Sequence, residues 1–246
     1  MKIKKLLKII ESIADQKGYS KPFLCGGLVR DKYRDVLKDI SDIDITNGDK
    51  SIFLLATDVS DYLRSQFKTQ TNTAKDGHKS IAFSNMKLDF SSNFNHPNIE
   101  NLLIQKNIQP TDMLKEMYSR DFTCNAMLAS CDFKTIFDPT KSGKYSIDNK
   151  ILIPPIDAAT SFHDDKRLVR AIYLSAKLNF NLNEDCIAFL RETTMSVGEQ
   201  NYLKNKLNEA FDMNPKKTIE ILNVTKMWDK IPVTEKLYPY YKNREK

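Results

Sequence analysis

Two aspartates separated by one residue, Asp42 and Asp44, have the spacing that most directly predicts chemistry in this sequence. They lie in segment 42–46, where polar and apolar residues alternate as in a half-buried β-strand. On such a strand both carboxylates point to one face, while Ile43 and Ile45 point into the core. Two carboxylates held this close repel each other unless a cation lies between them. The pattern therefore predicts an oxygen-ligand site of the kind that Mg²⁺ prefers.

A third aspartate, Asp89, lies on another predicted strand, 87–90, and would complete a two-metal site if that strand neighbours the first. In such a site one ion lowers the pKa of an attacking hydroxyl, and the other stabilises the leaving phosphate group. A lone Asp-x-Asp pattern is also common on ordinary solvent-facing strand edges. The residues around it must decide between the two interpretations.

A pair of glycines, Gly26 and Gly27, ends a short apolar run, 22–25, and precedes a predicted helix, 28–37. Glycines in a strand-to-helix turn let backbone N–H groups approach a phosphate closely, and Arg30 follows one turn further on. A plain turn is the alternative interpretation. Ahead of the aspartate pair, the glycines favour a phosphate-binding turn.

The elements that must position these residues follow from apolar periodicity, which predicts an α+β fold. A small mixed sheet flanked by helices is expected in residues 1–156, and an all-α domain in residues 157–246, with Pro154 and Pro155 at the break. Further helices are predicted at 3–17, ended by Gly18, and at 51–67, 168–178, 184–193, 200–211 and 216–224. Further strands are predicted at 79–83, 86–90, 124–129 and 135–137.

The hydrophobicity, the cysteine spacing and the net charge of the chain indicate its surroundings and its partners. The 246 residues are 41% hydrophobic with a mean hydropathy of -0.48 and contain no long apolar stretch, so we expect a soluble, cytoplasmic protein without membrane attachment. The four cysteines lack the spacing of a zinc or redox motif and are expected to be reduced and buried. A net charge of +6 suits a polyanionic partner such as RNA, although it also describes a well-solvated surface.

Four segments together resemble one family. Segment 24–31, Leu-Cys-Gly-Gly-Leu-Val-Arg-Asp, followed by the aspartate pair, resembles the Gly-Gly-x-Val-Arg-Asp and Asp-x-Asp signature of the class II (bacterial-type) tRNA nucleotidyltransferase and poly(A) polymerase family. Segment 119–127, Ser-Arg-Asp-Phe-Thr-Cys-Asn-Ala-Met, resembles its Arg-Arg-Asp-Phe-Thr-x-Asn-Ala motif. Segment 164–171, Asp-Asp-Lys-Arg-Leu-Val-Arg-Ala, resembles its Glu-Asp-x-x-Arg-x-Leu-Arg-Ala helix. Four motifs in this order are far more specific than any one of them.

The resemblance implies a polymerase β-like catalytic head followed by a helical neck, and roles for the matching positions. The metal ions would be held by Asp42, Asp44 and, on a looser alignment, Asp89. The nucleotide-binding positions would be Gly26, Gly27 and Arg30 at the triphosphate, Arg120, Asp121 and Asn125 near the sugar, and Asp164 and Arg167 at the base, with Arg170 beside them.

The base-reading pair also has a physical logic. Asp164 and Arg167 are three residues apart and therefore share one face of a helix. A carboxylate acceptor beside a guanidinium donor can satisfy the Watson–Crick edge of a base, so that the protein itself acts as the template. A surface ion pair is the alternative, and the other motifs favour base recognition.

The sequence departs from the family pattern near the nucleotide pocket. Ser119 replaces the first of two arginines, His163 replaces a glutamate, and Tyr173 replaces another arginine, which affects specificity more than chemistry. Family members normally continue past the neck into helical domains that grip the RNA. We expect the acceptor end to be held here by a lysine-rich surface, by a second copy of the chain or by a partner subunit. The lysines in question are Lys204, Lys206, Lys216 and Lys217.

The leading hypothesis is an RNA 3′-terminal nucleotidyltransferase that uses Mg²⁺ and ATP, with CTP as a further substrate, to add all or part of the CCA end of tRNA. A poly(A) polymerase acting on other RNAs is the alternative within the same chemistry. A nucleotidyltransferase that modifies a protein or a small molecule is a different class, which a base-reading pair disfavours. A catalytically inactive RNA-binding module is disfavoured because all three acidic positions are intact.

Overall fold

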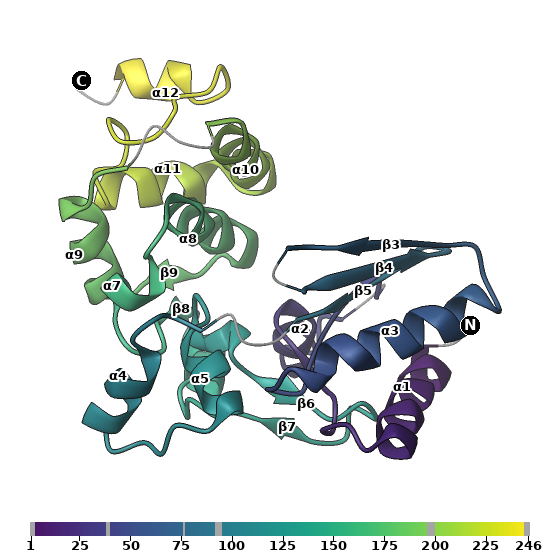
Figure 1. The fold of residues 1–246 in the computed structure, drawn as a ribbon. Coiled ribbons are helices and arrows are strands. Elements are labelled where there is room, and N and C mark those ends of the chain that lie inside the picture. Colours follow the sequence, from purple (N-terminus) through teal and green to yellow (C-terminus); the bar gives the residue numbers. More distant parts are fainter. Residues whose placement is uncertain (1–2, 38–39, 76, 92–94, 196–199, 244–246) are drawn as a thin grey trace. The chain divides into compact units, whose positions relative to one another are not determined.

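The chain has an α+β fold that divides into two compact units, Met1–Lys144 and Tyr145–Lys246, here called unit 1 and unit 2 (Figure 1). The computed structural model describes residues 3–37, 40–75, 77–91, 95–195 and 200–243. Within these ranges, no helix combines the length and the apolar character that crossing a bilayer requires. The four cysteines are free and buried, which confirms the prediction for them.

Unit 1 is built on a seven-stranded mixed sheet with the strand order β3-β4-β5-β2-β1-β6-β7. The strands are β1 (Phe23–Cys25), β2 (Asp42–Thr46), β3 (Thr69–Thr73), β4 (Lys79–Phe83), β5 (Met86–Phe90), β6 (Leu128–Ala129) and β7 (Ile136–Phe137). The helices are α1 (Ile3–Lys17), α2 (Gly27–Tyr33), α3 (Ser51–Arg64), α4 (Ile99–Gln105), α5 (Asp112–Tyr118), the 3-10 helix η1 (Thr123–Asn125) and α6 (Gly143–Asp148), which crosses into unit 2.

Strand β2 lies at the centre of this sheet, parallel to β5 and antiparallel to β1. Its apolar residues Ile43 and Ile45 are fully buried and face the same side as Thr71 on β3, whose hydroxyl lies 3.0 Å from Ser60 of α3. Helix α3 therefore covers this apolar face, and the alternate residues of β2 point to the opposite face. Helix α1 packs alongside α3 (Figure 1), burying Leu6, Leu7, Ile10 and Ala14.

Unit 2 is a helical domain with one two-stranded parallel sheet. Its elements are β8 (Ile151–Leu152), α7 (Ala158–Ser161), α8 (Asp165–Leu178), β9 (Asn181–Leu182), α9 (Glu184–Glu192), α10 (Gln200–Met213), α11 (Pro215–Val224) and α12 (Tyr238–Asn243). Helices α8, α10 and α11 contact one another (Figure 1). Because β8 pairs with β9, the segment just before Asp157 belongs structurally to unit 2. Asp157 as a functional boundary stays a prediction.

The strongly periodic segments confirm their predictions, and three others need correction. The helix at 3–17 and the strands at 42–46, 79–83 and 86–90 are present with the predicted bounds. The predicted helix 28–37 ends at Tyr33, because Asp35 takes a φ of 55° that an α-helix cannot hold. The predicted strand 124–129 begins instead as η1, and the predicted helix 51–67 ends at Arg64. Residues 38 and 39 lie outside the described ranges.

The buried face of β2 yields a stability prediction. Ile43→Ala should lower the free energy of unfolding by about 2 to 5 kcal/mol, because Ile43 is 0% exposed and the substitution leaves a cavity between β2 and its neighbours. The control is Ile104→Ala in α4, which is 55% exposed and should change stability by no more than about 0.5 kcal/mol. Urea unfolding followed by circular dichroism measures both. Equal losses for the two variants would contradict this assignment of the core.

Candidate active site

Three carboxylates gather on the sheet face opposite α3. Asp44 on β2 and Asp89 on β5 are direct register partners on neighbouring parallel strands, so their side chains point to the same face. Asp42 lies two residues before Asp44 and shares that face. Asp42 is exposed, Asp44 is half-buried and Asp89 is buried. The register therefore brings all three predicted acidic residues to one part of the sheet.

The surroundings of Asp44 raise its pKa. Burial raises the pKa of Asp44 above its usual value, the nearby charges of Asp89 and Asp42 raise it further, and Arg120 only partly opposes them. A divalent cation would relieve this repulsion, and an all-oxygen donor set suits magnesium. The acidic face thus fits the metal that the sequence predicts.

Asp89 is held differently from the other two aspartates. It accepts hydrogen bonds from Ser80 Oγ and from Lys87 Nζ, the latter at 2.5 Å, and His78 Nε2 lies 3.7 Å away. Burial raises the pKa of Asp89, but the bonds to His78, Lys87 and Ser80 outweigh it and lower the pKa to about 2. Among the described residues, no three His, Cys, Asp or Glu side chains are already arranged as a set of metal ligands. Asp42 and Asp44 are therefore the more accessible ligands, and Lys87 already balances the charge of Asp89.

The turn between β1 and α2 brings backbone against the acidic face. Gly26 precedes α2 with φ 70° and ψ -145°, a conformation that residues with a side chain rarely adopt. A Cβ at this position would lie 2.5 Å from Asp44 Oδ2 and 3.7 Å from Arg120 Nη1. At Gly27, a Cβ would lie 3.2 Å from Arg30 Nη2. Glycine is therefore required at position 26, whereas a side chain at position 27 would need only a small shift of the Arg30 guanidinium.

Arg30 binds other protein groups in this arrangement. Its side chain is 3% exposed, with Nε and Nη2 each donating to Asp31 at 2.9 Å and Nη1 donating to Asn125 Oδ1 at 2.6 Å. Asn125 in turn donates through Nδ2 to Asp121 Oδ1 at 3.0 Å. The structure therefore brings together three of the predicted nucleotide-binding residues as a network that ties α2 to η1. Arg30 is placed to position Asn125. Its contact with the triphosphate stays a prediction.

Arg120 lies between the acidic face and α5. One guanidinium nitrogen, Nη2, donates to Glu116 Oε1 and to Cys25 Sγ, each at 3.0 Å. Glu116 also accepts a 2.6 Å hydrogen bond from Thr46 Oγ1. Sequence reasoning identified Arg120 but missed Glu116, Thr46 and Cys25 as its surroundings. The only signal in the sequence is that Glu116 lies one helical turn before Arg120.

The predicted base-reading residues lie in unit 2, at the start of α8. Asp164 is the N-cap of this helix, and its Oδ1 accepts the backbone N–H of Arg167 at 2.8 Å. Arg167 Nη1 donates to the carbonyl of Ser161 at 3.2 Å, and His163 Nε2 lies 3.6 Å from Asp164 Oδ2. Arg170 is half-buried one turn further along. Asp164 therefore precedes the first turn of α8 and Arg167 lies within it, so the two residues meet at one helix end. Their role in reading the base stays a prediction.

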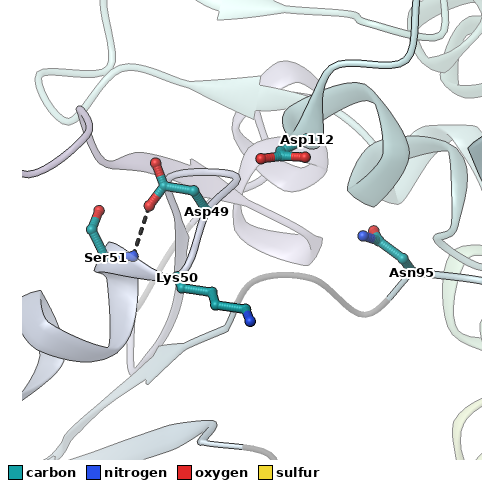
Figure 2. A pocket seen from close by; sticks show the side chains of 5 residues that line it. All are labelled: Asp49, Lys50, Ser51, Asn95 and Asp112. Atoms are coloured by element: carbon teal, nitrogen blue, oxygen red, sulfur yellow. Dashed lines mark hydrogen bonds between the residues drawn. The ribbon is translucent and has the colours of Figure 1, made fainter.

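A polar hollow of about 620 Å³ opens elsewhere in unit 1, at the starts of α3 and α5 (Figure 2). Asp49 and Asp112 bring two carboxylates to it, against one cation from Lys50. The Asp49 carboxylate already accepts the N–H of Ser51, the first residue of α3, at 2.7 Å, the contact marked in Figure 2. Of the residues that the structure describes, those lining it include neither an arginine nor a glycine turn, so this hollow is a poorer match for a triphosphate than the turn at Gly26, which has Arg120 beside it.

The comparison with known proteins decides the family. The family model described as the poly A polymerase head domain matches residues 22–153, more than half of the chain and all of the acidic face. The chain belongs to the poly A polymerase head domain family. The tRNA nucleotidyltransferase cca1 of Schizosaccharomyces pombe is 30% identical over an alignment of 177 residues, and this alignment covers 68% of this chain and 35% of that protein.

Several solved structures share the fold of this chain. A CCA-adding enzyme in complex with CTP has a TM-score of 0.68 at 20% identity, covering 92% of this chain and 52% of its own. The Thermotoga maritima CCA-adding enzyme in complex with tRNA has a TM-score of 0.66 at 19% identity, covering 98% of this chain and 57% of its own. The chain thus spans between about a third and three fifths of the length of these relatives.

Two departures from the family pattern have structural explanations. Ser119 is 2% exposed at the end of α5, where its hydroxyl donates to the carbonyl of Lys115 at 2.7 Å and accepts the N–H of His96 at 2.9 Å. The Ser119 hydroxyl therefore bonds to two backbone groups, and it cannot supply the positive charge of the arginine found in the family. Tyr173 lies on α8 with the ammonium group of Lys206 4.7 Å from its ring centre, so the position packs α8 against α10.

The Gly26 turn yields a second prediction. Gly26→Ala should lower the free energy of unfolding more than Gly18→Ala, which is expected to cost about 1 to 2 kcal/mol from its positive φ alone. Both glycines have a positive φ, but a Cβ at Gly18 would meet nothing within 4 Å, whereas one at Gly26 would meet Asp44. Urea unfolding measures the difference. In an Asp44→Ala background the Gly26→Ala penalty should shrink, and an unchanged penalty there would contradict the clash.

Proposed function

We propose that this protein transfers a nucleoside monophosphate from an NTP to the 3′-hydroxyl of an RNA and releases pyrophosphate, completing all or part of the CCA end of tRNA in the cytoplasm. The observation that carries the proposal is the register pair of Asp44 and Asp89 beside the Gly26 turn. Acidic side chains on one sheet face, next to backbone N–H groups and an arginine, match the needs of phosphoryl transfer, which are positioning and charge stabilisation.

Asp42 and Asp44 would hold magnesium, with Asp89 supporting them from β5. Bound magnesium supplies a lowered pKa for the attacking 3′-hydroxyl and charge stabilisation for the leaving pyrophosphate. The protein's own contribution is to fix the carboxylates: β2 and β5 hold them at one register position, and Ser80 and Lys87 hold Asp89. Carboxylates fixed in advance need no reorganisation when the substrate arrives.

The nucleotide would lie across the turn after β1. The backbone N–H groups of Gly26 and Gly27 are at the N-terminal end of α2, where a helix favours an anion. Arg120 adds a positive charge beside Asp44. Asp121 and Asn125, joined to Arg30, would support the sugar side of the site. These roles follow the family motifs.

We propose that the neck, from Asp157 onward, selects the base. At the start of α8 the Asp164 carboxylate and the Arg167 guanidinium offer an acceptor and a planar set of donors. ATP and CTP present different Watson–Crick edges, and both are proposed as substrates. A single acceptor and donor pair would have to reorient to accept both, since it must present different groups to each base.

The acceptor is proposed to be the tRNA 3′ end. The S. pombe relative is a tRNA nucleotidyltransferase, and a solved structure of the same fold is bound to tRNA. The net charge of +6 suits an RNA partner, and a second copy of the chain or a partner subunit is proposed to extend the grip. A poly(A) polymerase acting on other RNAs is the second candidate, because the matching family model carries that description.

One experiment tests the reaction and separates the candidates. Purified protein is incubated with magnesium and each labelled NTP in turn, together with tRNAs ending before C, after C, after CC or after CCA, and with an unstructured RNA. Transfer confined to tRNA that stops after a fixed number of nucleotides supports CCA addition. Open-ended addition of A to the unstructured RNA supports the poly(A) polymerase. EDTA and Asp42→Asn should each abolish transfer, whereas transfer that survives Asp42→Asn would remove Asp42 from the metal site.

Base selection yields a further prediction. Arg167→Ala should reduce the preference between the best and worst NTP by about tenfold or more, since a lost bidentate contact is worth roughly 1 to 3 kcal/mol. The rate with the best NTP should fall less than the preference does. The control is Arg191→Ala, also in unit 2, whose Nε donates to the carbonyl of Val224 at 2.7 Å. Unchanged selectivity in Arg167→Ala would contradict the template role of α8.

A further inference from the structure

A buried glutamate outside the recognised motifs, Glu116, lies one helical turn before Arg120 at the end of α5. It is 2% exposed. Its Oε1 accepts the 3.0 Å hydrogen bond from Arg120 Nη2, and its Oε2 accepts the 2.6 Å hydrogen bond from Thr46 Oγ1. Burial of a carboxylate is costly unless the charge is paired and hydrogen-bonded. Arg120, beside the acidic face, pairs with the Glu116 charge, and Thr46, at the end of β2, donates a further hydrogen bond to it.

The direction of the Thr46 hydrogen bond is fixed by its second contact. The N–H of Gly48 donates to Thr46 Oγ1 at 3.1 Å, so the single hydroxyl proton is directed to Glu116. Thr46 is the last residue of β2, and it shares the face of Asp44 because it lies two residues further along the strand. Glu116 therefore connects the strand that carries the catalytic aspartates to the arginine beside them.

Among the described residues, the hydrogen bonds of the Arg120 guanidinium run through one nitrogen, Nη2. Nη2 donates to Glu116 and to the Cys25 thiol, whose pKa burial raises to about 12, so that the thiol stays neutral and the charge at this contact comes from Glu116. Nη1 lies on the side of Gly26, 3.7 Å from the Cβ position of that residue, where the Asp44 carboxylate also lies. Nε is a buried donor without an acceptor among the described residues. The anchored nitrogen thus sets the direction of the rest of the guanidinium.

We propose that Glu116 is a positioning residue for nucleotidyl transfer: it holds the Arg120 guanidinium against the Gly26 turn, so that Arg120 meets the incoming nucleotide in one orientation. Glu116 acts through Arg120 and contacts no substrate itself. The inference rests on the proposed transferase function. An arginine side chain has about 2 kcal/mol of rotamer entropy, and an anchor that removes this freedom beforehand favours the reacting geometry.

The expected signature is a change in rate with little change in nucleotide binding. Glu116→Gln keeps the shape of the side chain and loses its charge, and should lower kcat by about ten- to a hundredfold, the range expected when a reacting group is misplaced by about 1 Å. KM for the NTP should change by less than about threefold, because uniform binding contacts remain. Glu116→Asp keeps the charge but withdraws it from Arg120, and should also lower kcat.

The test measures steady-state kinetics and thermal unfolding of the wild type, Glu116→Gln, Glu116→Asp and the control Glu100→Gln. Glu100 is an exposed α4 glutamate in the same unit, and its variant should keep wild-type kcat. Wild-type kcat in folded Glu116→Gln would overturn the inference. A wild type that transfers no nucleotide would contradict the proposed function instead, so the two failures are distinguishable.

A second pair of variants keeps the test decisive if Glu116→Gln does not fold. Thr46→Val removes the hydroxyl that donates to Glu116, and Thr46→Ser restores it. We expect Thr46→Val to lower kcat by more than threefold and Thr46→Ser to recover most of the loss, with KM for the NTP unchanged in both. A structural role alone would change the unfolding temperature and the active fraction, but not kcat per active site. Equal kcat in the two variants would overturn the inference.

Discussion

The pairing of β2 with β5 is the constraint on which the rest of the site depends. A parallel register with Asp44 opposite Asp89 sends two carboxylates to one face, while Ile43 and Leu88 go to the other. A slip of one residue would invert every side chain of β2. The buried isoleucines oppose such a slip, so the hydrophobic core under α3 also fixes the position of the acidic residues. The register between β2 and β5 therefore determines both the packing of the core and the position of the acidic residues.

The same constraint explains why cations and glycine collect around β2. The negative charges of neighbouring carboxylates repel one another. Two cations reduce this repulsion: Lys87 donates to Asp89, and Arg120 lies near Asp44. A close approach by the backbone is possible only where no side chain intervenes, which is the position of Gly26. The positions of Lys87, Arg120 and Gly26 therefore follow from the acidic face itself and do not depend on which substrate binds there.

The sequence predicted those features that depend on neighbouring residues in the chain. Alternation predicted β2 with its bounds, and the glycine pair marked a turn where a Cβ would meet Asp44. Strand β3, with the sequence Thr-Gln-Thr-Asn-Thr, has no apolar alternation and was not predicted, since it is held by its pairing with β4. Glu116 was missed because its partner Thr46 is 70 residues away in the chain, and contacts of that span leave no local pattern. For the same reason no pattern in the sequence indicated that Arg30 Nη1 donates to Asn125, which is 95 residues away in the chain.

The ion pair between Lys87 and Asp89 bears on whether unit 1 needs a metal ion in order to fold. A carboxylate that carries its own counterion inside the chain needs no external ion to tolerate burial, so unit 1 can fold during synthesis before any metal arrives. The proposed magnesium would then bind to an already folded unit 1 and would take no part in its folding. If magnesium is the proposed metal, a chelator would stop nucleotidyl transfer without unfolding unit 1, and adding magnesium back would restore the transfer.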